Sequence, residues 1–167
     1  MKTFHLIFVF IFLSFLSCTK EEWQTVNITG GYTNTPDPSG GFLSIPLPTG
    51  DTFMVPKKYK VGGSDNLVGE IDTTKSELVV NSVVINQLTN SFDVTYTISY
   101  FNKSGDQVSY KGSAQNYDNG TGISWQQISG GTGKYEGITG WLNTSLVANP
   151  NGAITISIIE GQATYKF

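Results

Sequence analysis

Apolar and polar side chains alternate along much of the chain after about residue 51. The clearest case is 92–100, where Phe, Val, Tyr, Ile and Tyr occupy every second position. This period of two is expected of a β-strand that buries one face. Similar or shorter strand-like segments are 53–61, 67–71, 78–88, 107–115, 124–128, 138–147, 153–159 and 162–167. No segment of this region has the 3.6-residue period of a helix, so we predict an all-β fold.

Turn-forming residues separate these segments at short intervals. Asn102-Lys103-Ser104-Gly105-Asp106, for example, is typical of a hairpin turn between two strands. Eight or nine strands in roughly 115 residues favour a small antiparallel β-barrel of about eight strands, because closure removes exposed sheet edges. A membrane-spanning barrel is the alternative, since the chain ends on an aromatic strand at Phe167. The short, glycine-interrupted strands argue against it.

The chain begins with a different pattern. Lys2 precedes an unbroken apolar run at 6–13, and Ser14-Phe15-Leu16-Ser17 leads into Cys18. This is the layout of a cleavable export signal. It resembles the lipobox of bacterial lipoproteins, in which a small residue precedes the modified cysteine, although Phe15 and Leu16 depart from the usual residues. The resemblance implies a signal peptide at 1–17 and lipidation of Cys18.

Two other interpretations of this leader remain open. An uncleaved anchor would need about 20 apolar residues to span a bilayer as a helix, and this segment is shorter. Ordinary secretory cleavage is the other alternative, in which case the position of Cys18 directly after a small residue would be a coincidence. Lipidation would instead make the chain a membrane-anchored protein.

The residues after Cys18 suggest an address and a tether. Thr19-Lys20-Glu21-Glu22 resembles the signal that sends some Gram-negative lipoproteins to the outer face of the outer membrane, although a solvated tether is the simpler alternative. We therefore expect a lipid-anchored protein of the outer membrane, with surface exposure favoured over a periplasmic orientation. Glycine and proline are frequent up to residue 50. The predicted organisation is a lipidated flexible tether at 18–50 and a β-barrel domain at 51–167.

Composition excludes several classes of function. After residue 17 the chain carries nine lysines, no arginine and 13 acidic residues, which makes nucleic acid a poor partner. The only histidine is His5 and the only cysteine is Cys18. Catalytic sites that pair serine or cysteine with histidine, and zinc sites of the usual kind, therefore cannot form in the domain. We expect no metal and no cofactor, and acid–base chemistry would depend on Asp, Glu, Tyr or Lys.

A glycine-rich run at 128–140 is the most distinctive motif. Its glycines are Gly130, Gly131, Gly133, Gly137 and Gly140. A phosphate-binding loop would have to open a helix, whereas predicted strands flank this run on both sides. The run resembles the hairpin of allene oxide cyclase and dirigent-like β-barrels. The resemblance covers about residues 51–167 and implies a structural connection between two strands, with its aromatic residue packed inward.

The same resemblance implies a barrel cavity for a hydrophobic molecule, but no catalytic residue of either family maps onto this sequence. Trp125, Tyr135 and Trp141 lie in or beside the glycine run and are candidates for contacting an apolar ligand or a glycan. Glu70 is the candidate acid, with Asp72, Glu136 and Glu160 as further acids in or beside strands. A carboxylate in an apolar barrel would have a raised pKa.

Two functional hypotheses follow. The first is a non-catalytic, envelope-anchored barrel that has a structural role or binds a small apolar ligand or glycan. The second is a cyclase- or isomerase-like enzyme that uses a carboxylate and a tyrosine on a hydrophobic substrate. The first is favoured because no catalytic set maps and a fold alone does not define an activity. A cavity that contains an acid beside a tyrosine would favour the second.

Overall fold

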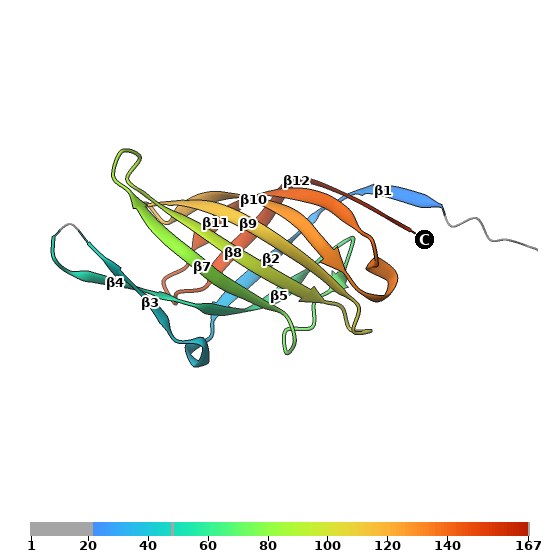
Figure 1. The fold of residues 1–167 in the computed structure, drawn as a ribbon, viewed down its shortest axis with the longest axis horizontal. Helices are drawn as coiled ribbons and strands as arrows, with labels where there is room; N and C mark the ends of the chain where they lie inside the picture. Colours follow the sequence, from blue (N-terminus) through green and yellow to red (C-terminus); the bar gives the residue numbers. More distant parts are fainter. Residues whose placement is uncertain (1–21, 48, 167) are drawn as a thin grey trace, which may run out of the picture.

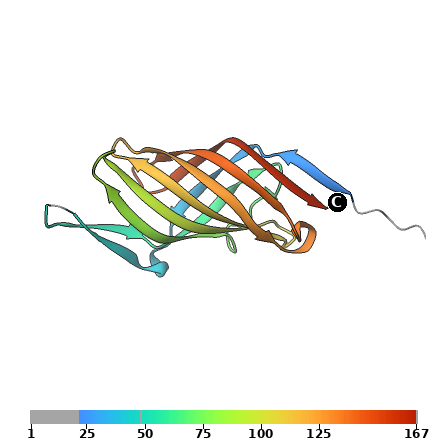
Figure 2. The same ribbon diagram turned by 45° about the horizontal axis from the view of Figure 1, so that its top comes forward.

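The computed structural model describes residues 22–47 and 49–166, which form a closed antiparallel β-barrel (Figures 1 and 2). Closure follows from the pairing of the last strand with both its chain neighbour and the second strand. The prediction of an all-β barrel of about eight strands is confirmed. The barrel strands, in order around the wall, are β2 (Gly30–Pro36), β5 (Lys58–Asp65), β7 (Glu77–Asn86), β8 (Ser91–Phe101), β9 (Gln107–Tyr117), β10 (Thr121–Gly131), β11 (Thr139–Ala148) and β12 (Ile154–Lys166).

Shorter elements lie at the two ends of the barrel. β1 (Trp23–Asn27) pairs with the last part of β12, and β6 (Gly69–Glu70) pairs with the end of β5. β3 (Phe42–Pro46) and β4 (Thr52–Pro56) form a separate two-stranded hairpin. The turns η2 (Pro38–Gly40) and η3 (Gly133–Tyr135) are single 3₁₀ turns.

The barrel begins earlier in the chain than the predicted boundary at residue 51. β2 lies in the wall between β12 and β5, and it directs Tyr32 and Asn34 into the interior, where each is 2% exposed. Other predicted strands also differ. The segment 53–61 is divided between β4 of the hairpin and the first part of β5. The segment 67–71 contains only the two-residue β6, and 153–167 contains one long strand instead of two. The leader, Cys18 and residues 19–21 lie outside the described residues.

The two ends of the barrel differ in how they are filled. At one end, which we call the closed end, the chain after β5 and the η3 loop pack Leu67, Val68, Ile71, Tyr135 and Ile138 into the interior, each at most 4% exposed. At the other end, the open end, the β3–β4 hairpin projects beyond the wall (Figures 1 and 2). β1 and the last part of β12 extend at the closed end. The interior of the closed end is therefore filled by side chains.

Candidate functional site

A cavity of about 330 Å³ occupies the open half of the barrel. Its walls are inward-facing apolar side chains of the barrel strands, and part of its rim comes from β4. The barrel residues that line it include Leu78, Val80, Val83, Val94, Ile98, Ala114, Leu146, Ile154 and Ile156. A volume of this size lies at the lower end of the range of small-molecule sites.

Small side chains on β9 create the space. Ala114 presents only a methyl group to the cavity, opposite Val94 on β8. Next along β9, Gly112 is covered by the ring of Tyr96, and a Cβ at Gly112 would lie 2.5 Å from that ring. Tyr96 lines the cavity, whereas Tyr100, which lies four residues further along β8 on the same face, does not. Tyr96 therefore forms part of the inner limit of the cavity, and burial raises its pKa to about 12.

The cavity wall is uncharged. Among the described residues that line it there is no Asp, Glu or Lys, and its polar side chains are Asn34, Tyr59, Tyr96 and Asn116. Asn34 is the most unusual of these, because its side-chain Oδ1 is buried and accepts no hydrogen bond. A buried polar atom without a partner costs about 1–3 kcal/mol. Asn34 is therefore a polar group that a ligand could satisfy.

The β3–β4 hairpin supplies an apolar rim at the mouth. Phe53, Met54, Val55 and Pro56 of β4 line the cavity, and the Phe53 ring lies 5.2 Å from the Phe92 ring on β8. Phe53 and Met54 remain 43% and 50% exposed. The hairpin has no strand partner in the barrel among the described residues. The hairpin therefore contacts the mouth through side chains such as Phe53, and the chain on either side of it continues into η2 and β5.

A carboxylate is buried elsewhere in the barrel, at the closed end. Asp65 ends β5 and is 6% exposed. Its Oδ1 accepts hydrogen bonds from the backbone N–H groups of Leu67 (2.7 Å) and Val68 (2.5 Å), and its Oδ2 accepts one from the Tyr32 hydroxyl. Burial raises the pKa of Asp65 above its usual value, although these hydrogen bonds oppose the shift.

Three tyrosines surround this carboxylate. The Tyr32 and Tyr100 rings stack at 4.6 Å, and the Tyr100 and Tyr110 rings lie 5.2 Å apart. The hydroxyls of Tyr100 and Tyr110 have no hydrogen-bond partner. Burial raises the pKa of Tyr32, Tyr100 and Tyr110 well above the usual value. The interior therefore holds an acid beside a tyrosine, but neither Asp65 nor Tyr32 lines the cavity.

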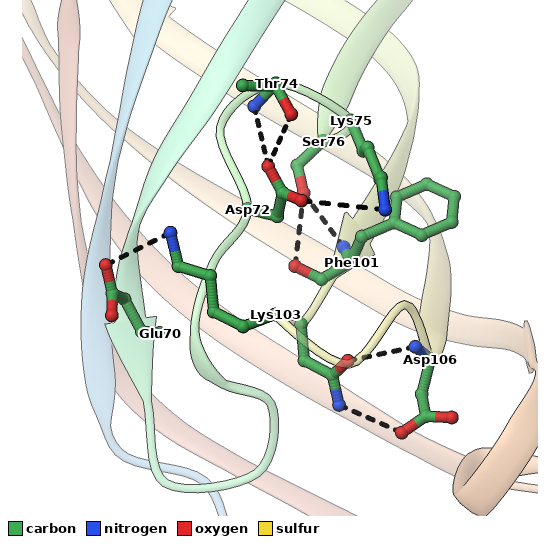
Figure 3. A network of polar contacts seen from close by, with 9 residues as sticks. Glu70, Asp72, Thr74, Lys75, Ser76, Phe101, Lys103 and Asp106 are labelled. Carbon is green, nitrogen blue, oxygen red and sulfur yellow. Dashed lines mark hydrogen bonds and ion pairs between the residues drawn. The ribbon is translucent and has the colours of Figure 1, made fainter.

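Two of the predicted site residues lie at the closed end. Tyr135 is fully buried, and its hydroxyl donates a hydrogen bond of 2.6 Å to the carbonyl oxygen of Leu67. Glu70 is exposed and forms an ion pair with Lys103 at 3.3 Å, within a group of loops fastened by polar contacts (Figure 3). Neither residue lines the cavity.

The glycine run, residues 128–140, connects β10 to β11 and turns Tyr135 inward. Gly133 shows why glycine is needed in it, because its φ is +60° and a Cβ there would lie 1.9 Å from Oδ1 of Asp106. Gly130, Gly131, Gly137 and Gly140 lie in the same connection and its flanking strands. Their surroundings are strand and 3₁₀ turn, not the start of a longer helix.

Trp125 and Trp141 lie on the outer wall, away from the mouth. Trp125 is 48% exposed, and Trp141 is partly exposed. Together with Gln127, Gly140 and Asn143 they line a shallow hollow on β10 and β11. The predicted aromatic candidates are therefore split between an outer surface and the packing of the closed end.

Sequence reasoning missed Asn34, Tyr59 and Phe53, which line the cavity. Asn34 lies in the region predicted as a tether, where glycine and proline hide the alternation, whereas Phe53 and Tyr59 lie in the predicted strand 53–61 but were not identified as site residues. Asp65 was also missed, because Gly62-Gly63-Ser64-Asp65 is typical of a turn. The spacing of Tyr32 and Asn34, two residues apart, was a weak signal that a strand begins before residue 51.

No family model matches the chain, and no curated protein matches it. Among solved structures it is similar to a pterocarpan synthase dirigent protein, with 12% sequence identity, coverage of 90% of this chain and 92% of that chain, and a TM-score of 0.44. Within the described ranges, no helix is long and apolar enough to cross a membrane. The same residues contain no group of three or more metal-ligating side chains.

Proposed function

We propose that this protein is an envelope-anchored lipoprotein whose barrel binds a small, neutral and largely apolar molecule in the cavity of the open end. The observation that carries the proposal is the cavity itself, with apolar walls and the unpartnered Oδ1 of Asn34. A site of this kind gains affinity from the apolar area that it removes from water, and a few polar atoms orient the ligand.

The charge of the wall defines the ligand class. A carboxylate or ammonium group in the cavity would lose its hydration without meeting an opposite charge on any described lining residue. A hydroxyl or N–H group, by contrast, can donate to Asn34. We therefore expect a neutral molecule with an apolar body and one hydrogen-bond donor.

The anchor gives the cavity an orientation. Cys18 precedes Trp23, the first residue of β1, by five residues, and five residues span at most about 18 Å. Because β1 extends at the closed end, a lipid on Cys18 would keep that end near the membrane. The mouth and its hairpin would then face away from the bilayer. Lys20-Glu21-Glu22 favours the outer face of the outer membrane in this proposal.

The enzyme alternative rests on Asp65 and Tyr32. Their pairing supplies a carboxylate and a tyrosine, but Oδ1 of Asp65 is used by two backbone N–H groups, and both residues lie outside the cavity lining. A catalytic carboxylate would have to reach a bound substrate. The binding function is therefore the better supported of the two.

Two matched dyes test the proposal. Phenylnaphthylamine is neutral, whereas anilinonaphthalene sulfonate has the same two aromatic parts and a sulfonate group, and both fluoresce more strongly in apolar surroundings. Residues 19–167 contain every described strand and the whole core, so this segment without lipid is suitable for titration. We expect saturable binding of the neutral dye and at least tenfold weaker binding of the anion. Equal affinity for both, or no binding of the neutral dye, would refute the proposal.

A further inference from the structure

The outer wall of the barrel has a row of polar side chains that crosses six strands. Strand register places these residues directly beside one another on the outward face, from β7 to β12. In that order they are Ser82, Thr95, Ser113, Trp125, Asn143 and Glu160. They all line one continuous groove on the outside of the barrel. We call this set the outer row.

The outer row combines hydrogen-bonding groups with an aromatic surface. Hydroxyls on three strands are followed by an indole, an amide and a carboxylate. The Asn143 amide donates a hydrogen bond of 2.7 Å to Oε1 of Glu160, which fixes the orientation of both side chains. The Ser82 and Thr95 hydroxyls lie 2.6 Å apart. Polar groups that are already held in place lose less freedom when they bind a ligand.

A second indole extends the aromatic surface. Trp141 pairs with Gln127, two residues along β10 from Trp125, so the two tryptophans are diagonal neighbours. They line a common hollow that adjoins the groove through Trp125 and Asn143. The flat face of an indole packs against the C–H face of a sugar ring, while its surroundings bind the hydroxyls.

We propose that the outer row and Trp141 form a binding site for a linear, neutral glycan, separate from the cavity. The groove contains two carboxylates, Asp93 and Glu160, and no lysine among its lining residues, so acidic glycans would be repelled. The nearest lysine along the register is Lys111, which lies opposite Gln127 in the neighbouring row. Strands about 4.8 Å apart give six strands a width of about 24 Å, enough for several sugar units.

Binding of defined hexasaccharides to residues 19–167 tests this inference by calorimetry. The probes are hexamers of glucose with two different linkages, of mannose and of xylose, with a hexamer of galacturonic acid as the charged comparison. We expect at least one neutral hexamer to bind, and the acidic hexamer to bind at least tenfold more weakly. Trp125→Ala and Trp141→Ala should each weaken binding at least tenfold.

Trp23→Ala is the matched control, because Trp23 is 54% exposed on β1, outside the outer row. It should leave glycan affinity unchanged. Circular dichroism verifies that each variant is folded. The inference is overturned if none of the neutral hexamers binds, if the acidic hexamer binds best, or if Trp125→Ala binds normally. It is also overturned if sedimentation shows a dimer that Trp125→Ala dissociates, since the face would then bind a second copy.

Discussion

Asp65 shows how one side chain defines the closed end of the barrel. Its carboxylate joins the end of β5 to the two backbone N–H groups of the turn that follows, and to the hydroxyl of Tyr32 on β2. The turn then directs Leu67 and Val68 inward, and the Tyr135 hydroxyl holds the Leu67 carbonyl from the glycine run. The carboxylate is thus a structural group that keeps one half of the barrel filled.

Replacing this carboxylate should therefore destabilise the barrel. Asp65→Ala leaves buried N–H groups without an acceptor, and we expect the free energy of unfolding to fall by about 3 kcal/mol. Asp65→Asn keeps the acceptor oxygen and should cost about half as much. Urea unfolding of residues 19–167 measures both. Equal and negligible losses for the two variants would show that the turn does not depend on Asp65.

The pH dependence of this contribution has a defined sign. Burial raises the native pKa of Asp65, whereas the unfolded chain has a pKa of about 3.9. Between these two values the native state binds the proton more strongly, so the contribution of Asp65 to stability decreases as the pH rises through the window. The stability of the unsubstituted chain relative to Asp65→Asn should accordingly fall from pH 4 upward. Unfolding curves at a series of pH values test this, and a rise would contradict it.

At the scale of elements, alternation predicts strands only where the inward residues are large and apolar. β8 follows the rule, because Phe92, Val94, Tyr96, Ile98 and Tyr100 all face inward, and its predicted range agrees closely with the observed strand. β2 could not be recognised in the same way. Its inward residues Tyr32 and Asn34 are separated by Thr33 and flanked by glycine and proline, which are typical of turns.

The site was harder to predict than the strands for a physical reason. The cavity exists because Ala114 is small and Tyr96 lies over Gly112, and both facts depend on neighbouring strands in the closed wall. Periodicity shows which residues share a face of a strand. It does not show which of the two faces points into the barrel. Trp125 is the clearest example, since the sequence made it a candidate for contacting a ligand but could not show that its side chain lies on the outer wall, where the register places it.

The β3–β4 hairpin should control access to the cavity. Replacing residues 43–55 by two glycines removes Phe53 and Met54 from the mouth, and the closely paired Phe42 and Pro56 allow a short turn to close the gap. We expect the barrel to remain folded and the neutral dye to dissociate at least fivefold faster in stopped-flow experiments. Phe53→Ser, which removes the ring contact with Phe92, should show a smaller change in the same direction. An unchanged dissociation rate in both variants would show that the hairpin does not control access to the cavity.

At the scale of the whole molecule, the proposed lipid on Cys18 would lie near the closed end of the barrel, opposite the cavity. Cys18→Ser should abolish incorporation of a labelled fatty acid and move the protein from the membrane to the soluble fraction of the cells. Substitution of Lys20, Glu21 and Glu22 by alanine should retain the lipid but reduce digestion by protease added to intact cells. Labelling that persists in Cys18→Ser would contradict the lipoprotein assignment.

We propose that the apolar ligand binds in the cavity and not on another surface of the barrel. Ala114→Phe places a phenyl ring in the cavity between Val94 and Ser124, while Lys111→Phe puts the same ring on the outward face of the same strand. The most direct measurement is the affinity of both variants for phenylnaphthylamine, with thermal unfolding as a check of the fold. We expect at least a tenfold loss for Ala114→Phe with the barrel still folded, and unchanged affinity for Lys111→Phe. Full affinity in a folded Ala114→Phe variant would contradict this proposal.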